Sequence, residues 1–172
     1  MNTHFEAKVR LIVPLWFAIA LLAGIVLPTL AAPPVKGAIF TTNSSCTTVN
    51  ANLYDSKLDV YLNGGPAHPG AAGLPDGFYY VRITQPNGQV LGTSVGSGND
   101  QPIHVTNGEF DQCYRLYSIL VRASDGLPGY DDTGNNGGEY KVWVSNEASF
   151  ANNSSKTDNF KIRPGDDSGG PQ

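Results

Sequence analysis

Two stretches that alternate apolar and polar residues behind a glycine constrain the fold of this chain more than any other feature. Residues 77–84 read GFYYVRIT, and residues 138–144 read GEYKVWV. Successive side chains of a β-strand point to opposite faces of the sheet, so each stretch predicts a strand with one apolar face. In both stretches that face consists of a tyrosine and two branched aliphatic residues. These residues are Tyr79, Val81, Ile83, Tyr140, Val142 and Val144.

A tight turn follows the first of these strands. Residues 85–89 read QPNGQ, in which proline presets φ and the Asn-Gly pair tolerates the positive φ of a tight turn. The sequence therefore predicts a β-hairpin whose return strand begins at Val90.

Short strand signals separated by Gly, Asn, Asp and Pro dominate the chain after residue 31. No stretch there keeps the apolar spacing of an amphipathic helix, so no helix is expected. The expected strands are residues 38–42, 47–54, 58–62, 78–84, 90–93, 102–105, 114–122, 139–144 and 159–162. Residues 114–122 are apolar on both faces, which predicts a position in the middle of a sheet. About seven to nine strands in residues 32–163 predict an all-β fold, a single antiparallel immunoglobulin-like or prealbumin-like β-sandwich.

The shared strand pattern, Gly-x-Tyr-x-Val/Ile-x-Val/Ile, resembles the Gly-x-Tyr-x-Val-x-Val strand of transthyretin-like (prealbumin-like, Cna-B-type) β-sandwich domains. In those domains a Leu-Pro-x-Gly turn commonly precedes the strand, and residues 74–77 read LPDG. The resemblance covers about a dozen residues at each of two places. It implies a β-sandwich and no particular activity, because such folds carry many unrelated functions.

The first 31 residues have the features of a secretory signal peptide. Lys8 and Arg10 precede an uncharged apolar run, residues 11–30, and small residues end it at Ala31. This arrangement predicts cleavage after Ala31 and a secreted protein, extracellular or at the cell surface. The alternative is an uncleaved N-terminal anchor, because the run is long enough to span a bilayer. Residues 164–172 contain no apolar side chain to bury and are expected to form a disordered tail.

Charge and cysteine content narrow the possible partners. The net charge is −4, which argues against nucleic acid as a partner because nucleic-acid binding needs basic patches. Export would place Cys46 and Cys113 in an oxidising compartment, where a disulfide between them is expected. Two free buried thiols are the alternative.

The acidic loop, residues 124–138, is the candidate metal site. Asp125, Asp131, Asp132 and Asn135 offer the carboxylate and amide oxygens that calcium prefers. Their spacing does not follow the EF-hand order, and Asp and Asn are also common turn residues. A solvated loop without metal is therefore the alternative, and no cofactor other than calcium is expected.

Aromatic residues opposite the predicted core faces are candidates for ligand binding. Tyr61, Tyr80 and Trp143 would point outward and could form a platform on which sugar rings stack. The alternative is that these rings pack at the rim of the core.

No arrangement of residues in the sequence indicates catalysis. His68 and His104 occur in no triad or metal-ligand spacing, and no nucleophile lies beside a base. The sequence therefore predicts a non-enzymatic structural or interaction module of the cell surface or extracellular matrix. Its partner would be a protein or a glycan, and a self-assembling fibre subunit is one form it could take. Membrane contact is expected only through an uncleaved leader. The alternative is a carbohydrate-binding module with an aromatic platform, with or without calcium.

Overall fold

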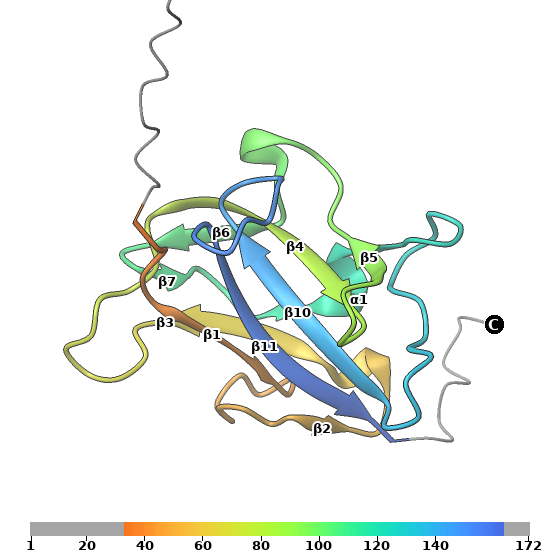
Figure 1. The fold of residues 1–172 in the computed structure, drawn as a ribbon. Coiled ribbons are helices and arrows are strands. Elements are labelled where there is room, and N and C mark those ends of the chain that lie inside the picture. Colours follow the sequence, from red (N-terminus) through yellow and green to blue (C-terminus); the bar gives the residue numbers. More distant parts are fainter. Residues whose placement is uncertain (1–32, 164–172) are drawn as a thin grey trace, which may run out of the picture. The chain divides into compact units, whose positions relative to one another are not determined.

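Two β-sheets face each other in the computed structural model, which describes residues 33–163 (Figure 1). The smaller sheet has the order β1-β3-β8, with β1 Ala38–Thr42, β3 Tyr61–Gly65 and β8 Tyr114–Arg115. The larger sheet follows the path β2-β11-β10-β4-β5-β9. Its strands are β2 Leu53–Tyr54, β11 Ser155–Ile162, β10 Glu139–Ser145, β4 Gly77–Thr84, β5 Val90–Thr93 and β9 Val121–Arg122. The fold is the all-β sandwich that the sequence predicts. The predicted signal peptide and tail lie outside the described residues.

Two further strands extend the large sheet at the start of β4. Strand β6, Ile103–Thr106, pairs antiparallel with β4, and β7, Glu109–Phe110, pairs with β6. All pairings are antiparallel except β2 with β11. No helix among residues 33–163 has the length and apolar content needed to cross a membrane.

The predicted core faces of β4 and β10 are buried. Val81, Ile83 and Val142 are completely buried. The Tyr140 ring stacks on Phe160 of β11 with centroids 5.2 Å apart. Burying one such aliphatic side chain stabilises the fold by about 1.5–3 kcal/mol, so these rows are a main source of stability.

The predicted hairpin between β4 and β5 is present. The Gln85 N–H donates to the Gln89 carbonyl at 2.8 Å, and the Gly88 N–H donates to the Gln85 carbonyl at 2.9 Å. Gly88 has a φ of +93°, a conformation that glycine adopts without the steric cost of a Cβ atom.

The prediction of one long central strand over residues 114–122 is wrong. That stretch forms β8, a four-residue helix α1, Leu116–Ile119, and then β9, so the expectation of no helix is wrong as well. Tyr114 and Leu116 are buried in alternation, but Ser118 is exposed and the next buried position is Leu120. The alternation that suggested a strand therefore breaks at Ser118, inside the helical turn.

Other predicted strands are shorter than expected or begin elsewhere. Only β2 forms within residues 47–54, and a 3₁₀ turn, η1 Lys57–Asp59, replaces the start of the strand predicted at 58–62. A second 3₁₀ turn, η2, covers Gly98–Asp100, and β7 was not predicted. Residues 33–163 therefore form eleven strands instead of the predicted seven to nine, because several consist of only two residues.

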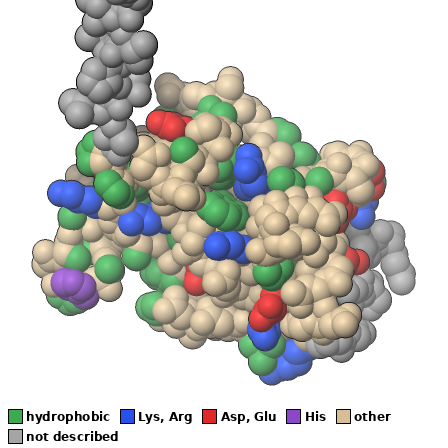
Figure 2. Space-filling view, viewed as in Figure 1, with side chains coloured by type: hydrophobic (Ala, Val, Ile, Leu, Met, Phe, Trp, Pro, Cys, Tyr) green, Lys and Arg blue, Asp and Glu red, His purple; other side chains and the backbone are tan. Residues whose placement is uncertain are grey.

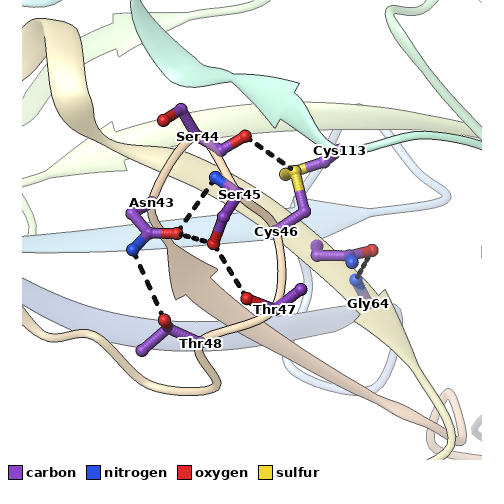
Figure 3. Close-up of a disulfide and its surroundings, with 9 residues drawn as sticks. Asn43, Ser44, Ser45, Cys46, Thr47, Thr48, Gly64 and Cys113 are labelled. Atoms are coloured by element: carbon purple, nitrogen blue, oxygen red, sulfur yellow. Dashed lines mark hydrogen bonds between the residues drawn. A yellow bond between two sulfur atoms is a disulfide. The ribbon is translucent and has the colours of Figure 1, made fainter.

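The disulfide between Cys46 and Cys113 is present, as predicted (Figure 3). The two Cα atoms are 6.0 Å apart and the residues are separated by 67 positions. The bond ties the loop after β1 to the segment before β8. In the chain-entropy model, closing a loop of this size stabilises the fold by about 4 kcal/mol. The Asn43 side chain shapes the same loop by accepting hydrogen bonds from the Ser45 N–H at 3.1 Å and the Ser45 hydroxyl at 2.6 Å.

The edge of β1 that faces away from β3 lies against β11 and the loop before it. The Thr41 N–H donates to the Asp158 carboxylate at 2.7 Å, and the Thr41 carbonyl accepts from the Ala51 N–H at 3.1 Å. The Val35 N–H donates to the Asn153 carbonyl at 2.8 Å. These contacts satisfy backbone groups that an open edge would offer to another chain.

Candidate ligand-binding surface

The outer face of the large sheet carries aromatic and basic side chains side by side. On β10, Lys141 and Trp143 point outward, because Tyr140, Val142 and Val144 between and beyond them are buried. On β4, Tyr80 and Arg82 point outward by the same alternation. Trp143 pairs with Arg82, and Ser145 pairs with Tyr80, so the two strands place these side chains in adjacent rows. Figure 2 shows basic and hydrophobic side chains next to one another over β10 and β4.

The Trp143 indole is held in place by two neighbours. Its Nε1–H donates to the Thr84 hydroxyl at 3.1 Å, a diagonal contact across the β10–β4 pair. The Lys141 ammonium lies 4.8 Å from the ring centroid on the same strand. A cation in this position is attracted by the negative face of the ring. The indole is therefore a fixed, half-buried group whose face is associated with positive charge.

The Arg82 guanidinium lies over a second ring, that of Phe150. The distance from Cζ to the ring centroid is 4.0 Å, and the Tyr80 ring meets the same Phe150 edge-on with centroids 6.3 Å apart. Desolvation lowers the pKa of Arg82 from its ordinary value, although arginine stays protonated at neutral pH. Phe150 comes from the loop between β10 and β11, so this contact joins three segments of the chain.

Phe150 adopts an unusual backbone conformation. Its φ is +54°, in the left-handed region that side chains with a Cβ atom rarely adopt, and its side chain is buried. Such a residue costs on the order of 1 kcal/mol, which the packing of its ring against Arg82 and Tyr80 helps to offset.

Arg82 and Lys141 have no acidic partner. Within residues 33–163, no carboxylate lies within ion-pair distance, 4.0 Å, of either side chain. Lys161 on the same face differs, because its ammonium lies 2.9 Å from the Glu139 carboxylate. The positive charge of Lys161 is thus neutralised by Glu139, whereas the charges of Arg82 and Lys141, which lie over aromatic rings, are not.

Tyr61 does not belong to this surface. It lies on β3 of the smaller sheet, between Thr42 of β1 and Arg115 of β8. The structure therefore brings Tyr80 and Trp143 together on one sheet face and places the third predicted platform residue on the other sheet.

The predicted calcium residues make separate local contacts. Asp125 accepts two hydrogen bonds from the Arg122 guanidinium, at 3.0 and 2.7 Å, and Asp132 forms an ion pair with Lys57. Asp131 accepts hydrogen bonds from Ser124 through both oxygens, and the Asn135 side chain accepts from the Gly137 N–H at 2.7 Å. In the part of the chain that the structure describes, no three His, Cys, Asp or Glu residues form a group that could hold a metal ion.

His104 takes part in a polar cluster at the start of β4. Its ring stacks on Phe78 with centroids 4.5 Å apart, and its Nδ1 lies 3.5 Å from the Asp111 carboxylate. Tyr114 donates a hydrogen bond to Asp111 and accepts one from the His104 N–H. Burial, with a contribution from Asp111, raises the pKa of Tyr114. The cluster joins β6 to the segment that carries the disulfide.

Strand alternation also places Arg82 and Lys141 outward, but only Tyr61, Tyr80 and Trp143 were predicted from the sequence as candidate binding residues, and Phe150 was missed. Alternation within one strand shows which way a side chain points. It does not show which strand lies beside it or whether an acid is near. No local signal marks Phe150, which reaches the sheet from a loop.

No protein-family model, curated protein or solved structure matches this chain. Membership of the transthyretin-like family therefore stays a prediction from the strand motif.

Proposed function

We propose that this protein is a secreted, non-enzymatic interaction module of the cell surface or extracellular matrix, and that the outer face of the large sheet is its binding surface. Secretion is supported by the sequence of the first 31 residues and by the Cys46–Cys113 disulfide, which is typical of an oxidising compartment. The binding surface is supported above all by Arg82 and Lys141, which lie over aromatic rings without a carboxylate nearby.

A protein that needed these strands only for stability would gain little from cations held over rings at the surface, because such contacts contribute only about 0.5–1 kcal/mol at exposed sites. Held in place by Trp143 and Phe150, the same groups offer a partner charged donors and apolar ring edges at low entropic cost.

A carbohydrate-binding module is the second candidate. Trp143 and Tyr80 lie on the same face, and the β11 side chains opposite the β10 residues are Thr157 and Asn159, which are exposed and suit hydrogen bonds to sugar hydroxyls. Calcium would assist such binding only if the acidic loop rearranged, because its carboxylates are engaged in local contacts. The carbohydrate proposal rests on the sheet face and does not require the loop.

A fibre subunit that donates its first strand is less well supported. Residues 38–42 already form β1 and pair with β3 of the same chain. Donation would require this strand to leave its own sheet. Concentration-dependent light scattering of the purified protein would reveal self-assembly by any other route.

The proposal is tested in the organism that encodes the protein. The tagged full chain is expected outside the cell, accessible to added protease, and bound to the cell surface or matrix. The triple variant Arg82→Ala/Lys141→Ala/Trp143→Ala is expected to be exported equally and to lose binding. A control variant, Lys36→Ala, removes an exposed charge outside the large sheet and should bind normally. Retention of the protein inside the cell, or equal binding by the triple variant, would contradict the proposal.

A further inference from the structure

We infer that the ligand of this face is an acidic polysaccharide whose carboxylate or sulfate groups contact Arg82 and Lys141 while its sugar rings lie along Trp143 and Tyr80. The inference rests on the proposed function and specifies the partner of the same face.

The distribution of charge is the first reason. The chain is acidic as a whole, with a net charge of −4. The outward residues of β4, β10 and β11 nevertheless include three cations and one acid, namely Arg82, Lys141, Lys161 and Glu139. Since Lys161 and Glu139 pair with each other, the uncompensated charge is positive. Such a local field attracts an anion and repels a cationic partner.

The spacing of the two cations is the second reason. Lys141 pairs with Thr84, and Arg82 is two residues from Thr84 on the same strand, so Arg82 and Lys141 are diagonal neighbours. Diagonal neighbours of an antiparallel pair are about 7–8 Å apart. A polymer with a repeating negative charge can place one charge at each of the two cations.

The polar residues around the cations favour a saccharide over a protein surface. Thr157 and Asn159 of β11 flank Trp143 and Lys141, and Thr93 of β5 flanks Arg82. Hydroxyl and amide groups at these positions suit a ligand rich in hydroxyls. A stable protein interface normally has an apolar centre. The exposed large apolar side chains of residues 33–163 are Val49, Leu53, Val90, Val95 and Leu127, and none of them belongs to β4 or β10.

A pocket extends the same surface toward the end of β11. It has a volume of about 220 Å³ and is lined in part by Glu139, Asn159 and Lys161. Its lining combines Phe160 with the amide groups of Asn52 and Asn159 and the charged groups of Glu139 and Lys161. The pocket gives room for a sugar unit next to those on Trp143.

The test measures binding of the protein to polygalacturonate, a sulfated chondroitin, a neutral dextran and single-stranded DNA. We expect binding to one or both acidic polysaccharides, which weakens as salt rises, and none to dextran. Arg82→Gln and Lys141→Gln should each weaken binding at least about fivefold, and the double variant more. Lys36→Gln removes the same charge elsewhere and should leave binding unchanged.

Each alternative result has a distinct meaning. Equal binding to dextran and polygalacturonate, lost in Trp143→Ala but kept in the double Gln variant, would overturn the acidic ligand and leave the proposed surface standing. Stronger binding to DNA than to either polysaccharide would overturn the assignment to a saccharide. If the wild type bound no polymer but still bound the cell surface, the acidic polysaccharide would be overturned and the proposed function would stand. No binding in either assay would remove the proposed function as well.

Discussion

The inner and outer faces of the large sheet are built from the same two strands and have opposite chemistry. Inward from β4 and β10, tyrosine and branched aliphatic side chains are buried with at most 2% of their surface exposed. Outward from the same strands, the side chains of Tyr80, Arg82, Lys141 and Trp143 are half-buried and combine rings with unpaired positive charge. The inner face accounts for stability. The outer face carries chemistry that stability does not require, which is why we propose it as the binding surface.

The largest expected effect on stability comes from an inner-face cavity. Ile83→Ala should lower the free energy of unfolding by about 2–5 kcal/mol, because Ile83 is completely buried and the space it leaves cannot be refilled. Urea denaturation measures the change, and Ile83→Val should cost only about 0.5–1.5 kcal/mol. Ligand binding by the folded fraction should persist. If Ile83→Ala lowered the free energy of unfolding no more than Arg82→Ala does, the division of roles between the inner and outer faces would be contradicted.

The pH dependence of stability should also reveal the inner face. Burial raises the pKa of Tyr79 to about 12, and its hydroxyl donates to the Pro75 carbonyl at 2.7 Å. Tyr79 therefore ionises more readily in the unfolded chain. Its contribution to stability is complete below pH 10 and is lost as the pH rises toward 12, by roughly 2 kcal/mol.

The matching variant for this effect is Tyr79→Phe. It should be less stable than the wild type at pH 8, because it lacks the hydrogen bond to Pro75, and it should lose less stability between pH 9 and pH 12. The burial of Tyr54 and Tyr114 also raises their pKa values, so only the difference between the wild type and the variant reports on Tyr79. Parallel pH profiles for the two proteins would show that Tyr79 is not buried as described.

On the outer face, the expected effects on stability are smaller and those on binding larger. Trp143→Ala should lower the free energy of unfolding by about 1–2 kcal/mol, because the indole is only partly buried and loses its bond to Thr84. Binding to the partner should be abolished. Trp143→Phe keeps a ring without the Nε1 donor and should retain part of the binding. Full binding by Trp143→Ala would remove the indole from the proposed surface.

The smallest expected effect concerns calcium. Asp125, Asp131 and Asp132 make separate contacts with Arg122, Ser124 and Lys57, so added calcium gains no preformed ligand set. Millimolar calcium should shift the melting temperature by less than about 1 °C. A shift of several degrees that disappears in Asp131→Asn would restore the calcium loop as a binding site.

Local patterns in the sequence were enough to predict β4, β5 and β10. Alternation defines the buried faces, and the Pro-Asn-Gly turn defines the hairpin. The helix α1 was missed because it has only four residues, too few for a helical period to be told from strand alternation. The Leu116 N–H donates to the carbonyl of Val60, the residue before β3, at 3.0 Å. This contact joins two segments that are far apart in the sequence.

The proposed binding surface was only partly predictable, because it also depends on contacts between distant segments. Tyr80 and Trp143 were correctly placed outward, but their position in adjacent rows depends on the pairing of two strands more than 50 residues apart in sequence. The disulfide was easier, because a chain with two cysteines leaves a single intramolecular pairing. Tyr61 was grouped with the platform because the strand pattern does not say to which sheet a strand belongs.

Fluorescence of Trp143 tests the central claim most directly. The chain has two tryptophans: Trp143 lies on β10, and Trp16 lies outside the described residues. The protein is titrated with polygalacturonate oligomers and with dextran oligomers of equal length. The emission of the Trp143→Phe variant is subtracted from that of the wild type to give the signal of Trp143. The account predicts a saturable change with the acidic oligomer that is weakened in Arg82→Gln/Lys141→Gln and kept in Lys36→Gln. If calorimetry detected binding of the acidic oligomer while Trp143 emission stayed unchanged, the ligand would bind elsewhere and the account would be contradicted.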